Sequence, residues 1–144
     1  MTAARILSNK KLDTVTIGAD ATIADAVDLL GKHNIGALVV SNDGKSIDGI
    51  VSERDIVRGL RERGASLLDC SVADCMTADV RTTTESASTR NMLSRMTELR
   101  LRHLPVVDDH GNLAGMVSIG DVVKLRLDDL VSEVEALHGY ITTG

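Results

Sequence analysis

Hydrophobic and polar positions follow one order twice along the chain. In the first half, a short extended stretch at 15–17 precedes apolar residues spaced i, i+3, i+4 and i+7 over 23–30, which is typical of a one-sided helix. Two apolar runs rich in β-branched residues follow at 37–40 and 47–51, with a polar turn between them, and a second one-sided helix begins at Ser52. The pattern predicts the element order β-α-β-β-α.

The pattern recurs at an offset of 66 residues, where positions 13–58 align with 79–124 without a gap. One copy of about 60 residues is marginal for independent stability, so we expect the copies to pack together. The sequence predicts an α+β protein of two units in a pseudo-two-fold arrangement, each a small mixed sheet flanked by helices. We expect a first unit at 1–72, with the N-terminal segment, and a second at 73–144, with the C-terminal helix. Pro105 lacks a backbone N–H and is expected near a strand end or a sheet edge.

The composition narrows the classes of function. Hydrophobic residues make up 43% of the chain, but Tyr140 is its one aromatic residue, so aliphatic side chains would have to cover any planar ligand. That composition and the net charge of -5 argue against a nucleic acid partner. No apolar run approaches the roughly 20 residues that span a bilayer, and the N-terminal residues lack the apolar stretch of a signal peptide. We therefore expect a cytoplasmic protein with no membrane partner.

The reactive residue types do not form a catalytic or metal-binding pattern. Cys70 and Cys75 have a C-x4-C spacing, which matches neither a redox pair nor a four-ligand zinc site. The histidines are scattered, and none lies at a helical or hairpin spacing from a second metal ligand. We expect no catalytic residue, no metal site and no required cofactor, and the chain is predicted not to be an enzyme.

One short motif marks the same place in both copies. The pattern Gly-h-h-Ser-x-x-Asp, in which h is hydrophobic, ends at Asp55 in the first copy and at Asp121 in the second. It lies at a predicted strand-to-helix turn, where unpaired N–H groups and the helix dipole stabilise a phosphate. Ser52 and Ser118 would add a hydroxyl donor, and each aspartate offers acceptors for the two hydroxyls of a ribose. The alternative is that each Ser-x-x-Asp is a capping box, which satisfies backbone donors and binds no ligand.

This motif is similar to the ribose-phosphate motif of CBS domains. The resemblance extends to Met76-Thr77, which opens the second copy, and to Arg-His-Leu-Pro-Val-Val at 102–107, and it covers about 12–124. The chain thus resembles a stand-alone pair of CBS domains, a Bateman module. That resemblance implies a non-catalytic regulatory protein that senses an adenine nucleotide (AMP, ADP or ATP) bound in clefts between the two units.

The resemblance also implies which residues surround the nucleotide. A threonine of each copy lies near the sugar or base, backbone near 35–37 or 101–103 meets the adenine edge and the phosphates, and nearby cations face the phosphates. The expected nucleotide-binding residues are Thr16, Ile35, Ala37, Ser52, Arg54, Asp55, Thr82, Leu101, Arg102, His103, Pro105, Ser118 and Asp121. The cations Arg54, Arg102 and His103 have no counterparts at the equivalent positions of the other copy, so the two sites are expected to differ.

The sequence leaves the ligand and the partner open. The ligand could instead be NAD or S-adenosylmethionine, or the chain could be an interaction or scaffolding module with empty clefts. Apolar residues at 125–137 predict a helical surface for a partner or for a second copy. The resemblance implies a homodimer, and the chain would act on a separate, unknown regulated protein.

Overall fold

Each half of the chain folds as the β-α-β-β-α unit that the sequence predicts, so the predicted α+β class is confirmed. The computed structural model describes residues 1–10 and 14–143. The first unit consists of β1 (Thr16–Ile17), α2 (Ile23–His33), β2 (Ala37–Val40), β3 (Gly49–Ser52) and α3 (Glu53–Arg63). The second unit consists of β4 (Thr83–Thr84), α5 (Thr89–Leu99), β5 (His103–Val107), β6 (Leu113–Ser118) and α6 (Ile119–Thr143). The other elements are α1 (Ala3–Asn9), the 3-10 helix η1 (Gly64–Asp69) and α4 (Val72–Cys75).

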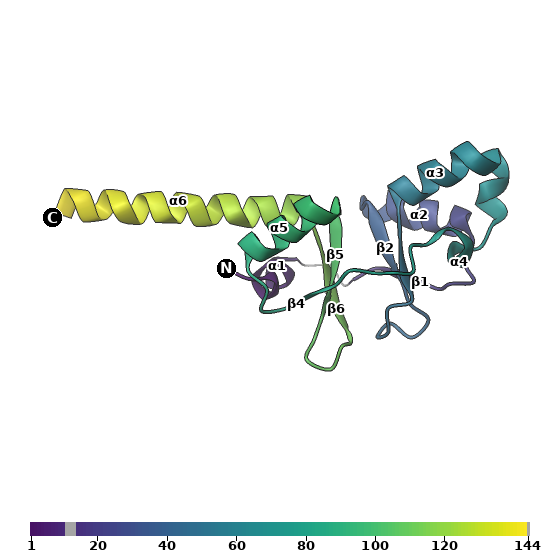
Figure 1. The fold of residues 1–144 in the computed structure, drawn as a ribbon, viewed down its shortest axis with the longest axis horizontal. Coiled ribbons are helices and arrows are strands. Elements are labelled where there is room, and N and C mark those ends of the chain that lie inside the picture. The colour runs from purple at the N-terminus through teal and green to yellow at the C-terminus, as the bar shows by residue number, and fades with distance from the viewer. Residues whose placement is uncertain (11–13, 144) are drawn as a thin grey trace.

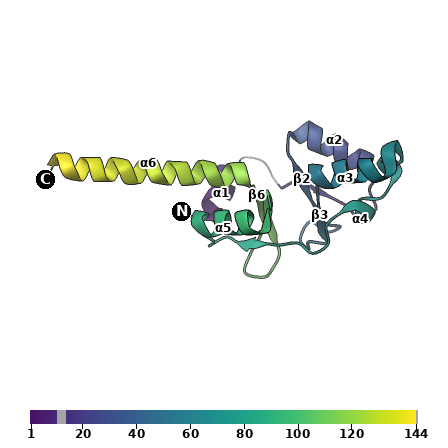
Figure 2. The same ribbon diagram turned by 45° about the horizontal axis from the view of Figure 1, so that its top comes forward.

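Each unit has a small mixed sheet of three strands. In the first sheet, β1 pairs parallel with β2, and β2 pairs antiparallel with β3. The second sheet repeats this arrangement with β4, β5 and β6. The two units lie side by side, and α6 projects far beyond the second one (Figures 1 and 2). In each unit, the last strand of the sheet leads directly into a helix, β3 into α3 and β6 into α6. Both of these strand-to-helix turns lie at the boundary between the units.

Capping side chains set where the helices begin. Thr22 and Asp25 form a capping box at the start of α2, with backbone N–H to side-chain oxygen distances of 3.1 Å in both directions. Ser88 caps α5 in the same place of the second unit, because its hydroxyl accepts the N–H of Asn91 at 3.0 Å. The apolar side of α2 is only partly buried, since Ile23 is buried completely while Val27 is 43% exposed.

The two units have separate aliphatic cores. Side chains of α2, β2 and β3 form the first, in which Ile23, Leu38 and Val51 are completely buried. Side chains of α5, β5 and β6 form the second, around Met92 and Leu104. Because an unpaired unit would leave much of its sheet uncovered, each core also needs a segment from outside its own β-α-β-β-α repeat.

The segments that precede the units supply that cover by crossing over. The helix α1 lies at the start of the chain, yet Ala3 and Ile6 are buried in the core of the second unit. The backbone N–H of Ala3 donates to the carbonyl of Ala87 at 2.9 Å. In the same way, Val72 of α4 is buried in the first core. The N-terminal segment thus packs on the opposite unit from the one to which its sequence position assigns it; the boundary between 72 and 73 stays a prediction.

The motif glycines make room for these crossing segments. A Cβ atom on Gly49 would lie 2.5 Å from Sδ of Met76 and 2.9 Å from the carbonyl oxygen of Thr77. A Cβ on Gly115 would collide with the side chain of Leu7 in α1. The glycine of the Gly-h-h-Ser-x-x-Asp motif is therefore required by packing between the units.

Pro105 does not occupy the position expected from the sequence. It lies in the middle of β5, which is the central strand of its sheet, and it pairs with Met116 of β6. The strand β4 has only two residues and pairs with Val106 and Val107, so no residue of β4 stands opposite Pro105. The expectation of a strand end or edge was therefore wrong. Proline is tolerated in this central strand because β4 is too short to place a hydrogen-bonding partner opposite its backbone nitrogen.

The helix α6 is the longest element and the one least covered by the rest of the fold. Its first half packs on α5, where Val122 and Leu125 are buried, and its second half extends into solvent (Figure 1). No helix in the described residues combines the length and the apolar character needed to cross a membrane.

Candidate functional site

A cleft of about 510 Å³ opens at the boundary between the two units. The first unit contributes the end of β3 and the first turns of α3, and the second contributes the segment that joins α5 to β5. The cleft volume lies in the range of small-molecule sites in proteins, about 300–1,000 Å³. Both units are needed to form it, so its shape depends on how they pack.

The strand-to-helix turn of the first unit forms one wall. Ser52 caps α3, and the backbone N–H of Ser52 donates to Oδ2 of Asp55 at 2.9 Å, while the N–H of Asp55 donates to Oγ of Ser52 at 3.3 Å. Both reciprocal hydrogen bonds of a capping box are therefore present in this motif. The other carboxylate oxygen, Oδ1, accepts a hydrogen bond from the hydroxyl of Thr77 at 3.3 Å. The hydroxyl of Ser52 also donates to Oδ2, at 3.0 Å, so Asp55 already accepts three hydrogen bonds. Since a carboxylate has about four acceptor positions, about one remains for a ligand, and a second becomes available if the hydroxyl of Thr77 is displaced.

The equivalent turn of the second unit is held differently. Ser118 and Asp121 form the same reciprocal bonds, at 2.9 and 3.2 Å. Here the ammonium of Lys10, at the end of α1, lies 2.6 Å from Oδ2 of Asp121 and 2.8 Å from the carbonyl oxygen of Met116. The two turns thus share their capping geometry, but a cation of the chain itself occupies the aspartate of the second.

The partners of Asp121 govern its acidity. Burial alone would raise the pKa of this carboxyl, but the hydrogen bond from Lys10 and those from Ser118 outweigh burial and hold the pKa below its ordinary value. Asp121 therefore carries a negative charge that Lys10 already neutralises. A ribose hydroxyl that approached Asp121 would have to compete with this ion pair.

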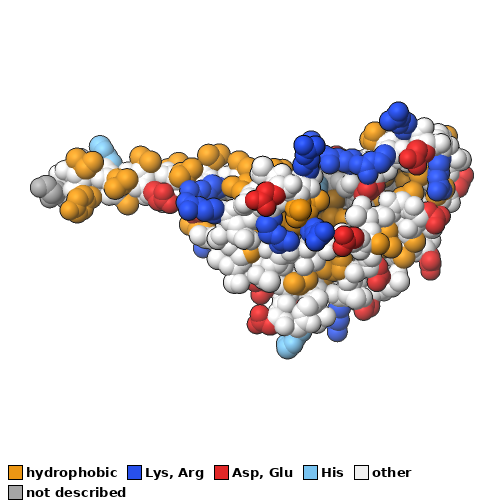
Figure 3. Space-filling view, in the orientation of Figure 1, with side chains coloured by type: hydrophobic (Ala, Val, Ile, Leu, Met, Phe, Trp, Pro, Cys, Tyr) orange, Lys and Arg blue, Asp and Glu red, His pale blue; other side chains and the backbone are white. Residues whose placement is uncertain are grey.

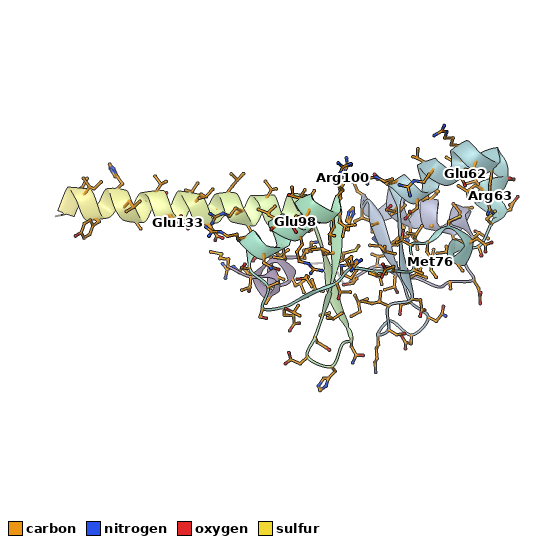
Figure 4. All side chains as sticks on the ribbon, viewed as in Figure 1. Glu62, Arg63, Met76, Glu98, Arg100 and Glu133 are labelled. Carbon is orange, nitrogen blue, oxygen red and sulfur yellow. The ribbon has the colours of Figure 1, made fainter. Side chains whose placement is uncertain are left out.

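Four arginines line the cleft of the first turn. Arg54 and Arg58 lie four residues apart on α3, while Arg100 and Arg102 lie on the segment between α5 and β5. Within the described chain, none of the four guanidinium groups forms an ion pair or a hydrogen bond. Lys and Arg side chains gather along the junction of the two units (Figure 3), and Arg100 stands at the end of α5 on the side that faces α3 (Figure 4).

His103 lies deeper in the same cleft. Its ring rests against the backbone of the other unit, because a Cβ atom on Gly36 would lie only 3.2 Å from Cε1 of the ring. Burial lowers the pKa of His103 below its ordinary value of 6.5, and the positive charge of Lys10 lowers it further, although Glu53 and Asp121 act in the opposite direction. The ring is therefore neutral near pH 7 and offers one donor and one acceptor rather than a fixed charge.

The structure brings together about half of the residues expected at a nucleotide site. Six of them line the cleft: Ser52, Arg54, Asp55, Leu101, Arg102 and His103. The expected phosphate-facing cations Arg54, Arg102 and His103 thus meet in one cleft, although they come from different copies of the repeat. The described lining of this cleft does not include Thr16, Ile35, Ala37, Thr82, Pro105, Ser118 or Asp121.

The expected residues outside the cleft have structural neighbours of their own. Thr16 pairs with Val39 in the first sheet, and Ala37 is completely buried opposite Ser52. Ile35 packs against the first core, and Pro105 is buried in β5. The carbonyl of Thr82 accepts a hydrogen bond from Arg95.

Sequence reasoning missed several residues of these sites. Arg100 has a left-handed backbone, with φ of 55°, at the end of α5, and no local pattern predicts that its side chain would face the other unit. Lys10 was assigned only to a flanking helix. Extending the 66-residue offset backwards aligns Lys10 with Met76, directly before Thr77. Because Met76 and Thr77 lie beside the first Ser-x-x-Asp turn, this alignment would have placed Lys10 beside the second turn.

A metal centre is not indicated in the part of the chain that the structure describes. Within residues 1–10 and 14–143, no three His, Cys, Asp or Glu side chains lie together as metal ligands would. The groups that face the cleft are guanidinium, hydroxyl, carboxylate and imidazole groups. They suit an organic anion that also carries hydroxyl groups.

Known proteins share both the sequence pattern and the fold. A model of the CBS domain matches the chain twice, at residues 4–62 and 72–128. The CBS domain-containing protein CBSX3, mitochondrial, of Arabidopsis thaliana is 39% identical over 129 residues, which cover 87% of this chain. The chain spans only 62% of the length of that relative.

Two solved structures match over most of the chain. A CBS-domain containing protein of Agrobacterium tumefaciens has a TM-score of 0.82 and 41% identity, over 88% of this chain and 99% of that one. A CBS domain protein of Pyrobaculum aerophilum, complexed with AMP, has a TM-score of 0.75 and 27% identity, over 84% of this chain and 89% of that one. Because the family model matches both halves and the fold agrees with these structures, the chain belongs to the CBS-domain family and carries two CBS domains.

Proposed function

We propose that this chain is a regulatory module, without catalytic activity of its own, that binds an adenine nucleotide in the cleft between its two CBS domains. The observation that carries the proposal is the set of four arginines without protein partners beside the turn formed by Ser52 and Asp55. Arg54 and Arg58 repel each other across one helical turn, which destabilises a free helix. An anionic ligand would remove that repulsion and gain charge-assisted hydrogen bonds.

The charge balance of the cleft favours phosphate groups. Four arginines face two carboxylates, Glu53 and Asp55, so the lining is positive although the whole chain has a net charge of -5. A local positive region on an acidic protein attracts small anions without attracting nucleic acids in general. The charges favour AMP, ADP or ATP over S-adenosylmethionine, since the sulfonium of the latter is itself a cation.

The remaining groups fit the rest of a nucleotide. The first turn of α3 offers backbone N–H donors to a phosphate, and Asp55 offers acceptors to ribose hydroxyls. The hydroxyl of Ser52, which donates to Oδ2 of Asp55 at 3.0 Å, would have to rotate to donate to a phosphate. Aliphatic side chains of the lining, Ile50, Val57, Leu99 and Leu101, would cover the faces of the base. Backbone groups would read the edge of the base, which explains how adenine is selected without an aromatic side chain. The AMP complex of the Pyrobaculum aerophilum protein supports this class of ligand.

The surroundings of Cys75 do not favour a nucleophilic role for this residue. Burial raises the pKa of the Cys75 thiol, and the positive charge of Arg63 offsets this only in part, so the thiolate needed for nucleophilic attack is disfavoured.

We propose that the module acts as a homodimer on a separate, regulated protein, and that it reports the supply of adenine nucleotides. Sustained hydrolysis of ATP or AMP by the purified chain would contradict the non-catalytic role.

Thermal unfolding with a panel of ligands tests the proposed binding. AMP, ADP or ATP should raise the melting temperature, because a ligand that binds only the folded state stabilises it by about 2.7 kcal/mol at 100 times its Kd. NAD and S-adenosylmethionine complete the panel. The double variant Arg54→Ala/Arg102→Ala should lose most of the shift and keep its fold, since both side chains are exposed and unpaired.

The matched control removes one positive charge elsewhere. Arg90 lies on the exposed face of α5, outside the cleft, and Arg90→Ala should keep the full shift. Equal shifts in the wild type and the double variant would show that the cleft arginines do not bind the ligand. The absence of any shift with all five ligands would leave the empty-cleft interaction module as the better account.

A further inference from the structure

The projecting helix α6 carries a row of apolar side chains that face solvent. The α6 stripe is defined by six residues that are 40–74% exposed: Val123, Leu127, Leu130, Val134, Leu137 and Ile141. Hydrophobic side chains follow the projecting helix in the space-filling view (Figure 3), where no other part of the described chain reaches them. Burying such a row stabilises a protein in proportion to the apolar area that is removed from water. A single copy of the chain does not gain this stabilisation.

The spacing of the α6 stripe is that of a coiled coil. Successive members are 4, 3, 4, 3 and 4 residues apart, which is the alternation that the a and d positions of a heptad follow. In heptad terms, Leu127, Val134 and Ile141 occupy a positions, and Val123, Leu130 and Leu137 occupy d positions. This alternation keeps the six side chains on one side of α6, along which a second helix can pack.

The α6 stripe is distinct from the face that packs on the chain's own body. That inner face contains Val122, Leu125 and Asp129, whose carboxylate accepts the hydroxyl of Thr89 at 3.3 Å. At about 100° per residue, the stripe lies roughly 110° around the helix from this inner face. The helix can therefore hold its own domain on one side and a partner on another.

We propose that the α6 stripe is the seam of a parallel, two-stranded coiled coil between two copies of this chain. In the outer part of the stripe, Val134 and Ile141 at a, together with Leu130 and Leu137 at d, are the combination that favours two parallel strands. Nearer the body, Leu127 at a and Val123 at d do not follow this preference. With Val131 and Tyr140 at its edges, the stripe exposes on the order of 800 Å², about what each partner buries in a standard interface. The occupant is thus a second copy, which carries the same stripe at equal concentration.

Charges beside the stripe favour the parallel orientation. In a parallel pair, Glu133 at a g position lies opposite the partner's His138 at an e position, whose ring N–H can donate a hydrogen bond to the carboxylate. Within its own chain, Glu133 pairs with Arg126 at 3.7 Å. In the antiparallel pair that overlaps the whole stripe, Glu133 would face the same carboxylate of the other copy. Glu133 lies on α6 beside the start of α5, where the helix leaves the body of the second unit (Figure 4).

The seam rests on the proposed homodimer and specifies how it forms. Parallel helices place the two CBS pairs at the same end of the coil, so that two nucleotide clefts sit side by side. A regulated protein could then contact both copies at once. The seam lies outside the cleft, so changes to it should leave nucleotide binding intact.

Disruption of the seam is the first test. Light scattering of the wild type should give twice the chain mass of 15.3 kDa at micromolar concentration. The variant Leu130→Gln/Leu137→Gln should dissociate to monomers, because the loss of each buried anchor weakens association by about tenfold or more. Both side chains are exposed in the single copy, so the fold and the nucleotide-dependent melting shift should persist. The control Asp128→Asn/Glu135→Gln, at two exposed positions of α6 outside the stripe, should stay dimeric.

Disulfide trapping tests the orientation. Leu137→Cys should cross-link with its own copy under mild oxidation, since equivalent d positions of a parallel pair come within the roughly 7 Å between Cα atoms that a disulfide requires. Glu135→Cys is the matched control on the outer face, and the wild type reports the background from Cys70 and Cys75. A wild type that stays monomeric, a Leu130→Gln/Leu137→Gln dimer, or equal cross-linking of the two cysteine variants would each overturn the proposal. None of these results would by itself affect the proposal of nucleotide binding.

Discussion

At the scale of single residues, the two Ser-x-x-Asp turns differ in the group that meets their aspartate. Asp55 accepts a hydrogen bond from a neutral hydroxyl, that of Thr77, whereas Asp121 pairs with the ammonium of Lys10. A neutral hydroxyl can be replaced by a ribose hydroxyl with little change in electrostatic energy. Displacing Lys10 would leave two charges to be solvated again, so the second turn should bind a nucleotide more weakly.

Removing the Lys10 ammonium should therefore open the second turn. We expect Lys10→Met to raise the stoichiometry of ATP from about one towards two per chain in titration calorimetry, because Asp121 is then free to accept ribose hydroxyls. Protein stability should fall by about 1 kcal/mol or less, since both groups of the pair are partly exposed. Arg5→Met removes a charge from the exposed face of the same helix and should behave as the wild type. An unchanged stoichiometry in Lys10→Met would refute this role of the ion pair.

The residues of the Ser-x-x-Asp motif could be predicted because the internal repeat and the chemistry of their side chains indicate the same positions. Ser52 and Asp55 recur at a fixed offset, and their side chains satisfy a helix start whether or not a ligand is present. Lys10 and Arg100 were not predictable from local pattern, because each reaches its site through packing between units. Their roles depend on contacts between residues that are far apart in the sequence.

At the scale of elements, the motif glycines follow from the crossing of α1 and α4 between units. The missing Cβ atoms of Gly49 and Gly115 leave space for Met76 and Leu7. The two positions differ in what would have to move. At Gly49 a backbone carbonyl stands in the way, while at Gly115 only the flexible end of a leucine does.

Alanine should therefore destabilise the protein more at one of these glycines than at the other. We expect Gly49→Ala to lower the free energy of unfolding by about 1–3 kcal/mol, as overpacking does, and Gly115→Ala to lower it by less. Gly31→Ala is the control, because nothing lies within 4 Å of its Cβ and alanine favours the helix α2. Urea unfolding measures all three. If Gly49→Ala and Gly31→Ala had the same stability, the crossing segment would not depend on the glycine.

Element order was the most predictable part of the fold. Periodicity placed the strands and helices of both units, and the repeat confirmed each assignment with the other. The position of Pro105 was not predictable, because it depends on β4 being only two residues long. Strand length at a sheet edge is decided by the neighbouring loops, and periodicity gives little information on so short a segment.

At the scale of the whole molecule, one cleft collects cations from both units. Arg54 and Arg58 come from the first CBS domain, and Arg100 and Arg102 come from the second, so a bound nucleotide would hold the two domains together. A ligand that binds one packing of the domains more tightly than another shifts the balance between them by that difference in affinity. The projecting α6 belongs to the second domain, and it offers a route by which such a shift would reach another protein.

A crystal structure of the chain grown with ATP tests the central claim most directly. The account predicts nucleotide density in the cleft between the domains, with ribose at Asp55, phosphates towards Arg54 and Arg102, and adenine among the aliphatic side chains. It also predicts that Lys10 still pairs with Asp121 wherever the second turn is empty. Nucleotide density elsewhere on the chain, or an empty cleft at a saturating concentration of ATP, would contradict the account.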